Sequence, residues 1–456
     1  MDTKNTSLVK NFKELVDHGQ RSIRIEALQV IDAGIRGADP GYGTRRMVKL
    51  DGERLYVGAK DFDLKAVRRI FVVGVGKGSF PIAEALEEIL AERISEGVVV
   101  VKEGEQRRLR RIEVLEAGHP IPNEKSIAGA IRIRDIAKKA EEGDLVLAVV
   151  TGGASALTVL PPEGIQLHEL QELTDNLLKS GAVIREMNAV RKHLCLLKGG
   201  RLVAMIQPAE AVTLTLDTAP EGMPWPDMCL ADPSTFQDAV TVLKNYGIWE
   251  KTAASIRNYL LEGLKHPERE TVKTLTGMKT SIISVGDPPS ACQAAANCAA
   301  GLGYRPVILG THLEGESSEV GICLAGIVKE ILKYQRPFQP PCALISGGET
   351  TVTITDACGK GGPNQELVLA FANKLGACQR DVVCVAVDTD GTDGPTDIAG
   401  GVVDGDTMVR VQGAKMDLTG YIKTHNASEA LQRLNDAVIT GHTGTNVMNL
   451  RVILIR

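Results

Sequence analysis

The chain has 456 residues, of which 43% are hydrophobic and 24% are charged, the composition of an ordinary soluble globular protein. Its formal net charge of −5 gives no electrostatic reason to expect binding to nucleic acid or to an anionic membrane surface. Nine cysteines without a C-x-x-C pair or zinc spacing, a polar N-terminus and the lack of an apolar run of roughly 18 residues indicate a cytoplasmic protein with reduced thiols.

The first half of the chain alternates apolar strands with helices. After a helical pattern over residues 11–38, the stretch RRIFVVGVGKGSFPIAEALEEIL predicts a strand at residues 70–75, a glycine turn and a helix. EGVVVVKEG and DLVLAVVTGGASAL are the next expected strands, and IAGAIRIRDIAKKAEEG is an expected helix between them. Continuous apolar strands alternating with helices predict a parallel sheet that is covered on both faces.

Further along, LQELTDNLLKSGAVIREMNAVRKHL reads as helical, and AEAVTLTLDTAPEGMPWPDMCLADPSTF as a strand that enters a long loop. A charged stretch at residues 267–279 interrupts the alternation, which begins again at TSIISVGD. A chain of this length is expected to have two or three domains at roughly 100–200 residues each. We therefore predict two α/β domains, residues 1–270 and residues 271–456.

Three glycine turns each follow an apolar strand: VVGVGKGS, VVTGGASALTV and LISGGETTVTI. Because the carboxyl ends of parallel strands meet at one edge of a sheet, such turns suit a nucleotide or phosphate. The candidate residues for that role are Gly74, Gly76, Gly152, Gly153, Ser155, Gly347 and Gly348. The first turn matches neither the dinucleotide fingerprint nor the Walker pattern. The competing interpretation is a set of ordinary tight turns, with Lys77 solvated.

Two clusters of polar residues are candidates for binding an acid or a phosphate. Asn188, Arg191 and Lys192 fall within one helical turn, where an arginine can hold a carboxylate or phosphate through two hydrogen bonds. The stretch TDACGKGGPNQELVLAFA places Lys360 and then three polar side chains at an expected helix start, which favours an anion. A solvated helix face is the alternative for the first cluster.

A third cluster is acidic. Asp388, Asp390 and Asp393 follow an apolar strand in AVDTDGTDGPTDIAGG. Carboxylates gathered at a strand end suit Mg²⁺, which often bridges to substrate phosphates. Turns stabilised by aspartate side chains, together with an N-cap for the next helix, are the alternative.

Long stretches of the chain resemble the glycerate 2-kinase family, whose C-terminal part is called the MOFRL domain. They include VVGVGKGSFPIAEAL, EAGHPIPNEKS, NAVRKHLCLLKGGRL, GGPNQELVLAFA, DGTDGPTDIAGGVVDG and TGHTGTNVMNLRVIL, in the order in which the family has them. The resemblance implies two α/β domains flanking an active-site cleft. The N-terminal domain would be Rossmann-like with a mainly parallel sheet, and the C-terminal one a second α/β domain of the MOFRL type.

The resemblance also implies an ATP- and Mg²⁺-dependent kinase that converts D-glycerate, or a closely related sugar acid, to its 2-phosphate. Its partners would be these small molecules, with no nucleic acid and no membrane, and a homodimer is compatible with it. Lys77 matches the lysine regarded as catalytic, and Asp217 matches an acidic position near the substrate. The substrate-binding positions would be Asn188, Arg191, Lys192, Glu349, Lys360, Asn364, Gln365 and Glu366.

The chain departs from the family pattern in places that bear on the acceptor. Pro363 stands where the family usually has a functional arginine, and Lys360 in the same loop lacks the rigid fork of a guanidinium. Ala154 replaces a glycine, and the loop after Asp217 lacks the usual Gly-Asp and Ser-Gly-Pro-Thr segments. Two alternatives therefore stay open. One is an oxidoreductase of the hydroxypyruvate reductase type, for which the first turn lacks the nicotinamide fingerprint. The other is a non-catalytic protein that binds small acids.

Overall fold

The computed structural model describes residues 7–104, 107–119, 121–216, 225–354 and 358–456. The chain forms two compact units, Pro40–Val285 and Met1–Asp39 with Gly286–Arg456. The predicted α/β class and the number of domains are confirmed. The division differs from the predicted boundary between residues 270 and 271, because strand β9 (Thr280–Gly286) belongs to the sheet of the Pro40–Val285 unit.

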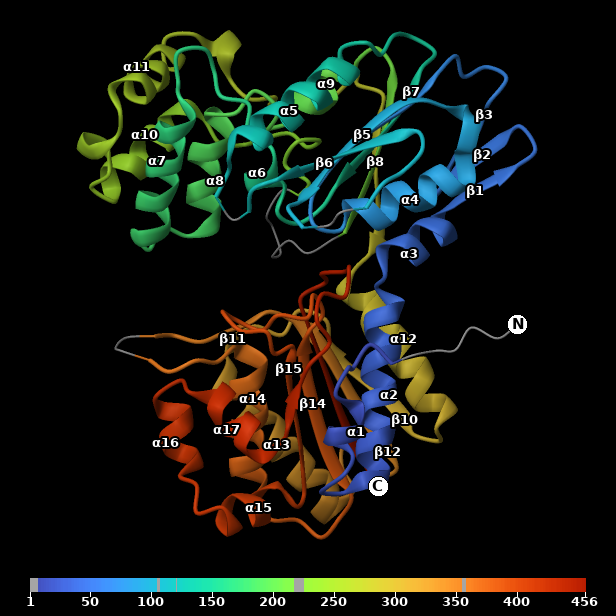
Figure 1. Ribbon diagram of the computed structural model, residues 1–456, viewed down its shortest axis with the longest axis vertical. Coiled ribbons are helices and arrows are strands. Elements are labelled where there is room, and N and C mark those ends of the chain that lie inside the picture. The colour runs from blue at the N-terminus through green and yellow to red at the C-terminus, as the bar shows by residue number, and fades with distance from the viewer. Residues whose placement is uncertain (1–6, 105–106, 120, 217–224, 355–357) are drawn as a thin grey trace. The chain divides into compact units, whose positions relative to one another are not determined.

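The Pro40–Val285 unit contains a six-stranded sheet in the order β6-β5-β4-β7-β8-β9 (Figure 1). All of the ladders from β6 to β8 are parallel. These strands are β4 (Ile70–Val75), β5 (Ile94–Lys102), β6 (Ile112–Ala117), β7 (Leu145–Val150) and β8 (Glu210–Leu216). In chain order the sheet is 3-2-1-4-5-6, the doubly wound arrangement whose order reverses between its first and fourth strands. The predicted Rossmann-like sheet is thereby confirmed, and its switch point lies between β4 and β7.

Burial explains the apolar strand sequences of this unit. Every residue of β4 and β7 is buried, so these strands read as continuous apolar runs. Phe71, Val73 and Val75 alternate onto one face, where α5 and α9 pack against them. The helices of this unit are α3 (Pro40–Met47), α4 (Ser79–Leu90), α5 (Glu124–Ala137), α6 (Ala154–Leu157), α7 (Leu167–Lys179), α8 (Ile184–His193), α9 (Arg201–Ile206), α10 (Phe236–Asn245) and α11 (Ala254–Gly263).

Two further parts complete this unit. The antiparallel strands β1 (Val48–Asp51), β2 (Arg54–Val57) and β3 (Lys60–Asp63) form a small sheet. Helices α7, α8, α10 and α11 share a separate hydrophobic core that includes Leu173, Val190 and Phe236. The stretch expected to be helical throughout breaks between α7 and α8, where Gly181 has a φ of +78°, a conformation that ends a regular helix.

The second unit contains a mixed six-stranded sheet in the order β10-β12-β17-β14-β15-β16. Strand β17 runs antiparallel to both of its neighbours, β12 and β14. The strands are β10 (Arg305–Gly310), β12 (Cys342–Gly348), β14 (Val382–Asp388), β15 (Gly400–Asp404), β16 (Ala437–Val438) and β17 (Asn449–Ile455), with β11 (Gly315–Glu316) and β13 (Thr350–Thr351) paired separately. The last strand of the chain therefore lies in the centre of the sheet.

Helices cover both faces of this mixed sheet (Figure 1). Helices α13 and α14 pack on the face that carries Cys342, Cys384 and Ile453, and α2 and α12 pack together on the sheet from its other face. The helices are α1 (Phe12–Leu15), α2 (Arg21–Gly37), α12 (Pro288–Gly301), α13 (Ser317–Tyr334), α14 (Pro363–Leu375), α15 (Thr407–Gly413), α16 (Leu418–Lys423) and α17 (Ala427–Leu434).

A buried ionic cluster explains why Met1–Asp39 belongs to this unit and not to the predicted first domain. The fully buried guanidinium of Arg24 lies 2.9 Å from the carboxylate of Asp436 and is also paired with Asp404. Helix α2 approaches α12 so closely that a methyl group added to Gly37 would lie 2.1 Å from Cβ of Ala294. These contacts join residues that are hundreds of positions apart, so a local reading of the sequence could not place them together.

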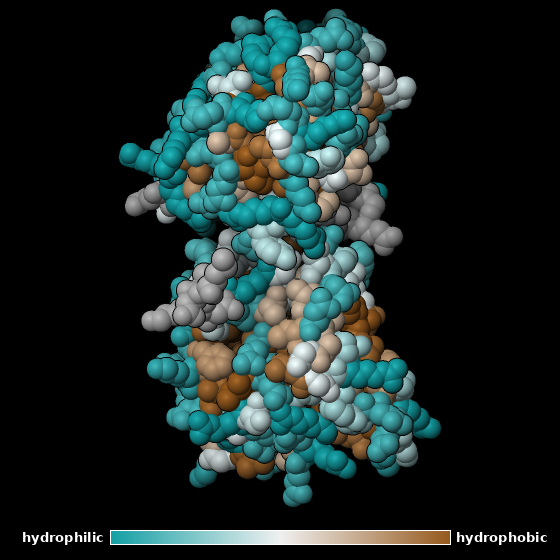
Figure 2. All heavy atoms as spheres, turned by 90° about the vertical axis from the view of Figure 1, so that its right-hand side faces the viewer, coloured by the Kyte–Doolittle hydropathy of each residue, from teal (hydrophilic) through white to brown (hydrophobic). Residues whose placement is uncertain are grey.

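Hydrophilic residues cover most of each unit on the face shown in Figure 2, and the hydrophobic ones form small patches between them. Among the helices that the structure describes, none has both the length and the apolar character needed to cross a membrane. All nine cysteines have free thiols.

Candidate functional site

Two glycine turns are joined at the switch point of the parallel sheet. The backbone N–H of Lys77 donates to the carbonyl oxygen of Gly152 at 2.8 Å, and that of Gly78 donates to Oγ1 of Thr151 at 3.0 Å. Gly76 has a φ of +132°, and a methyl group added there would lie 2.1 Å from Oγ1 of Thr151. Glycine is therefore required at position 76 for the two turns to meet, and the contact fixes the start of the Lys77 side chain.

Lys77 and His119 both lie beside Gly153. A methyl group added to Gly153, whose φ is +88°, would lie 3.2 Å from Cγ of Lys77 and 3.2 Å from Cδ2 of His119. No atom lies within 4 Å of such a group on Gly152. The turn after β7 thus leaves open backbone beside a half-buried lysine, which is the arrangement that a phosphate-binding turn needs.

The imidazole of His119 is neutral at physiological pH. Burial, together with the positive charges of Lys77 and Lys102, lowers its pKa to about 4. A neutral imidazole keeps one donor and one acceptor nitrogen. In the part of the chain that the structure describes, no hydrogen bond occupies either nitrogen, so both are available to a ligand.

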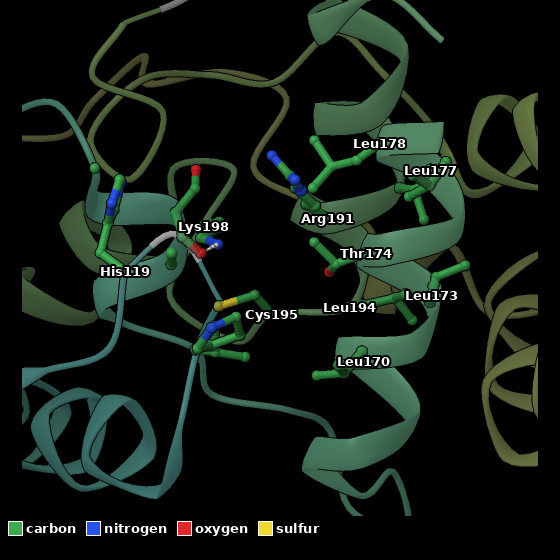
Figure 3. Close-up of a pocket in the computed structure, with 16 residues that line it drawn as sticks. His119, Leu170, Leu173, Thr174, Leu177, Leu178, Arg191, Leu194, Cys195 and Lys198 are labelled. Atoms are coloured by element: carbon green, nitrogen blue, oxygen red, sulfur yellow. Dashed lines mark hydrogen bonds between the residues drawn. The ribbon is translucent and has the colours of Figure 1, made fainter. Parts of the chain in front are cut away.

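A cavity of about 230 Å³ begins at this turn and extends between α7 and α8 (Figure 3). Side chains of α7 form one wall, and His119 and Lys198 lie on the opposite side. Most of its lining is apolar, and its main side chains are Val159, Leu170, Leu173, Thr174, Leu177, Leu178, Val190, Leu194 and Cys195. The same cavity reaches Gly153, Ser155 and Arg191, which are three of the predicted site residues.

Two buried side chains, Lys198 and Asp227, lie near the part of the cavity that contains Ser155. Lys198 is 2% exposed, and its Nζ donates to the backbone carbonyl of Ser155 at 2.8 Å. Asp227 is 7% exposed, and its Oδ1 has no hydrogen-bond partner among the described residues. Burial raises the pKa of Asp227 above its usual value, although the charges of Lys198 and Lys192 oppose the shift.

The predicted cluster on α8 separates into residues with different surroundings. Arg191 lines the cavity, whereas the buried ammonium group of Lys192 pairs with Asp232 at 2.5 Å. Asn188 is half-buried on the same helix. A carboxylate inside the protein therefore already satisfies Lys192, and Arg191 is the member of the cluster that a ligand in the cavity can reach. Asp217 lies outside the described residues.

Three of the predicted phosphate-binding glycines have roles in packing. Gly74 lies inside β4, where an added methyl group would come within 2.9 Å of Cβ of Val149. Gly348 has a φ of +114°, and a methyl group there would lie 2.3 Å from the backbone nitrogen of Leu313. A methyl group added to Gly347 would lie 3.3 Å from Sγ of Cys292 and 3.3 Å from Cβ of Pro288. Contact with neighbouring backbone and side chains therefore explains these glycines without a ligand.

A second group of predicted residues gathers in the other unit, at the carboxyl ends of β12 and β14. Gly348 and Asp388 both pair with Asn449, the first residue of β17, so these strand ends are neighbours. Beneath them lies the buried Arg451, whose Nη2 donates to Oγ1 of Thr350 at 3.0 Å. Glu349 is exposed at the same edge of the sheet.

The polar residues at the start of α14 are buried and bonded within this unit. The carboxylate of Asp393 accepts the backbone N–H groups of Asn364 at 3.1 Å and Gln365 at 2.9 Å, and so caps the helix. The side chain of Gln365 also accepts from Ser428 at 2.6 Å, and Glu366 lies 2.9 Å from Nδ1 of His425. The sequence predicted that Asn364, Gln365 and Glu366 contact substrate. In the structure, each of the three has a hydrogen-bond partner within the protein.

The aspartates of the acidic loop after β14 form turns and a helix cap, as in the alternative interpretation of its sequence. Asp388 accepts from the backbone N–H of Asp390 at 3.0 Å, and Asp390 accepts from that of Thr392 at 2.8 Å, so both stabilise turns. The helix that Asp393 caps is α14, which precedes it in the chain, and not the next helix. Among the described residues, no group of three or more His, Cys, Asp or Glu is placed to hold a metal ion.

The electrostatics of Asp388 still favour a cation. Burial and the carboxylate of Asp390 raise the pKa of Asp388 well above its usual value. Repulsion of this kind is relieved by a positive ion or by a proton. Among the described residues, neither Asp388 nor Asp390 forms an ion pair with a cationic side chain.

Pro363 and Lys360 lie in different settings. Pro363 is the first residue of α14, a position where its fixed φ suits the helix and its missing N–H is not needed. Lys360 is exposed and lines a separate polar hollow together with Thr396, Asn426 and Ser428.

Three functional candidates were missed by the sequence interpretation: His119, Lys198 and Asp227. His119 lies in EAGHPIPNEKS, where a histidine between glycine and proline after a strand was a usable signal. Asp227 is a carboxylate between apolar residues of the loop after β8. Lys198, in CLLKGG, looks like a surface lysine before a turn, and its burial depends on tertiary contacts.

Known proteins match nearly the whole chain. The family model described as a domain of unknown function (DUF4147) matches residues 26–261, and the model described as the MOFRL family matches residues 342–449. A protein from Pyrococcus horikoshii named glycerate 2-kinase is 41% identical over 436 residues, which cover 95% of this chain and 97% of the relative. A protein from Agrobacterium vitis named putative hydroxypyruvate reductase is 36% identical over 392 residues, 85% of this chain and 99% of the relative. The crystal structure of a glycerate kinase from Thermotoga maritima matches with a TM-score of 0.83 at 36% identity, covering 95% of this chain and all of that one.

Proposed function

The chain belongs to the glycerate 2-kinase family, and from this premise we propose that it transfers the γ-phosphoryl group of ATP to the 2-hydroxyl group of D-glycerate or a closely related sugar acid. The products would be ADP and the 2-phosphorylated acid. We place the reaction in the cytoplasm, as the sequence leads us to expect.

The observation that carries this proposal is the junction of the two glycine turns at the switch point, with Lys77 between them. Ligands of doubly wound sheets bind beyond the carboxyl ends of the strands at this point. Open backbone at Gly152 and the charge of Lys77 supply what a polyphosphate needs there. Phosphoryl transfer depends mainly on positioning and on neutralising charge, so a fixed cation is the most useful single group.

We assign roles to the chain's own residues on this basis. Lys77 would neutralise charge on the transferred phosphoryl group, and its backbone bond to Gly152 keeps the attachment of its side chain in place. Arg191 would hold an anionic group at the polar end of the cavity. Lys198 would position Ser155 through its bond to the carbonyl oxygen of that residue.

Mg²⁺ would be held through Asp388 and Asp390. Magnesium is usually bound through one or two carboxylates together with water and substrate phosphates, not by a cage made only of protein groups. The two carboxylates, with the raised pKa of Asp388, fit that pattern. When bound, the ion neutralises charge on the nucleotide phosphates. Asp393 would serve the same loop by fixing the start of α14.

A second candidate is reduction of hydroxypyruvate with a nicotinamide cofactor, which the name of the Agrobacterium vitis relative favours. The turn after β4 argues against it, because Ser79 stands where the third glycine of the dinucleotide fingerprint would lie. The test is to measure ADP release from ATP with D-glycerate and, in separate samples, NADH oxidation with hydroxypyruvate. Acid-dependent ADP release supports the kinase. NADH oxidation without ADP release would replace it, and neither activity would indicate a binding protein.

A further inference from the structure

The cavity beside the turn after β7 has an apolar body and a polar end. Its body is formed by leucines of α7, with Val190 of α8, Leu194 directly after α8, and Val159. Its polar end contains Gly153 and Ser155, next to Lys77, and Arg191 also lines the cavity. A ligand that fits this shape has an apolar part at one end and an anionic part at the other.

The acid substrate does not fit the apolar body. Glycerate carries a carboxylate and two hydroxyl groups on three carbons, and burying unpaired polar groups among leucines is unfavourable by several kcal/mol. A purine base has two large apolar faces, and its polar atoms lie only at its edge. Thr174 places a hydroxyl group and Cys195 a thiol in the wall, where such an edge could be met.

The size of the cavity supports the same choice. At about 230 Å³ it is smaller than the roughly 300–1,000 Å³ of sites that enclose a whole drug-sized ligand. It therefore suits one ring system of a nucleotide and leaves the phosphates outside. The cavity leads directly to Gly153, next to which the open backbone of Gly152 and the charge of Lys77 provide the surroundings that phosphates need.

We propose that this cavity binds the adenine base of the nucleotide, with its edge toward Thr174 and its phosphates directed to the Gly152–Gly153 turn and Lys77. The proposal rests on the proposed function for the identity of the nucleotide. The new element is the location of the base. The contacts that bind it would come from α7 and α8, which lie outside the parallel sheet.

The test fills the cavity while leaving the phosphate region intact. Ala156 of α6 lines the cavity, so Ala156→Phe places a ring inside it. Glu172→Phe is the matched control, because Glu172 is an exposed residue of α7 that does not line the cavity. Binding of ADP and of inorganic tripolyphosphate is measured by titration calorimetry on both variants and on the unmodified protein, with the KM values for ATP and D-glycerate.

We expect Ala156→Phe to raise the Kd for ADP and the KM for ATP by about tenfold or more, a loss of at least about 1.4 kcal/mol. Binding of tripolyphosphate and the KM for D-glycerate should not change, and Glu172→Phe should behave like the unmodified protein. An unchanged Kd for ADP would overturn the proposal. So would equal losses for ADP and tripolyphosphate, or a rise confined to the KM for D-glycerate, which would place the acid in the cavity.

A second variant covers the case in which Ala156→Phe does not fold. Leu178 lies at the edge of the cavity and is 53% exposed, so Leu178→Ser should fold and should weaken ADP binding several-fold. No change in its Kd would contradict the proposal. The direct titrations also separate the two hypotheses. If ADP binds in a cavity-dependent manner but no acid is phosphorylated, the proposed function fails and the base site stands. If acid is phosphorylated but the Kd for ADP is the same in the cavity variants as in the unmodified protein, only the proposed adenine site is wrong.

Discussion

The backbone N–H of Lys77 donates to the carbonyl oxygen of Gly152 at 2.8 Å, and this bond, with the one from Gly78 to Thr151, joins the turns that follow β4 and β7. Because these strands flank the point where the strand order reverses, the bond places a cation at the position where doubly wound sheets bind their ligands. The backbone bond does not involve the side chain of Lys77. The contribution of the ammonium group can therefore be measured separately from that of the turn.

Replacing Lys77 with alanine should lower kcat by about 10²–10³-fold, the effect of removing a preorganised charge from a transition state. The melting temperature should stay close to that of the unmodified protein, because the Lys77–Gly152 backbone bond is retained. The matched control is Lys49→Ala, which removes an exposed lysine of the same unit and should leave kcat unchanged. Near-normal turnover in folded Lys77→Ala would contradict the assigned role.

The imidazole of His119 should titrate near pH 4 and should respond to the charge of Lys77. Burial is the largest cause of its lowered pKa, and the positive charge of Lys77 is the next. Lys77→Met should therefore raise the pKa of His119 but leave it below the usual value, because the burial remains. Proton NMR titration of the ring measures this shift. A pKa that is the same in both proteins would mean that the two side chains do not interact.

Lys77 and His119 show which parts of the site could be predicted from the sequence. A continuous apolar run sets the limits of β4, and its glycines mark the turn, so Lys77 was placed correctly at a strand end by local pattern. His119 lies beside Gly153 although β5 and β4 separate β6 from β7 in the sheet, so the path of the chain after β6 brings the two together. The cavity depends on the break at Gly181 and on the packing of α7 against α8. Each of these is a tertiary relationship that no short stretch of sequence contains.

The start of α14 shows a limit of another kind. Asn364, Gln365 and Glu366 have the polarity of ligand-binding groups, but all three are buried, and Asp393, 29 residues after Asn364, caps the helix. The number of polar side chains in a stretch does not show which of them meet solvent. In the same way, the residues of β17 do not reveal that it lies in the centre of its sheet. An edge strand covered by a helix would have an equally apolar sequence.

Substitutions at Asp390 and at Asp393 should distinguish an effect on metal binding from an effect on stability. Asp390→Asn should raise the Mg²⁺ concentration needed for half-maximal activity without a large change in melting temperature, because its turn still has an oxygen acceptor. Asp393→Ala should lower the free energy of unfolding by roughly 1–3 kcal/mol through loss of hydrogen bonds to a charged group. Activity assays with EDTA followed by added Mg²⁺, together with urea unfolding, measure both effects. Full activity in EDTA would refute the metal requirement.

The Arg24–Asp436 pair should make the stability of its unit depend on acid pH. Burial alone would raise the pKa of Asp436, but Arg24, His18 and Arg410 lower it on balance. A carboxyl group whose folded pKa is lowered stabilises the protein fully above its unfolded pKa of about 3.9, and this stability is lost as the pH falls through the folded value. Asp436→Asn should cost about 3–5 kcal/mol at pH 7, because it leaves Arg24 without that charge.

Urea unfolding between pH 2.5 and 7 measures this dependence. The control is Asp61→Asn, which removes an exposed partner of Arg54 and should change stability by less than about 1 kcal/mol. If Asp436→Asn and Asp61→Asn lose the same amount, the buried pair has no special role in holding α2 on the mixed sheet.

Pro363→Arg should raise the turnover of D-glycerate if the residue at this position faces the acceptor. The family usually has an arginine there, and a hydrogen bond to a charged group is worth roughly 1.5–3 kcal/mol, or about 10–150-fold in kcat/KM. Position 363 opens α14, where an arginine can adopt the helical backbone without strain, so the exchange should not disturb the cap from Asp393.

The measurement compares kcat/KM for D-glycerate and for several four-carbon sugar acids in the unmodified protein, in Pro363→Arg and in Pro363→Ala. The alanine variant removes the proline without adding a cation, so it separates the effect of charge from that of a more flexible backbone. A gain for D-glycerate in the arginine variant alone would show that the natural proline lowers activity toward this acid. If all three proteins share one substrate profile, residue 363 does not contact the acceptor. In that case Arg191, which lines the cavity of the other unit, is the next guanidinium to test for recognition of the acid.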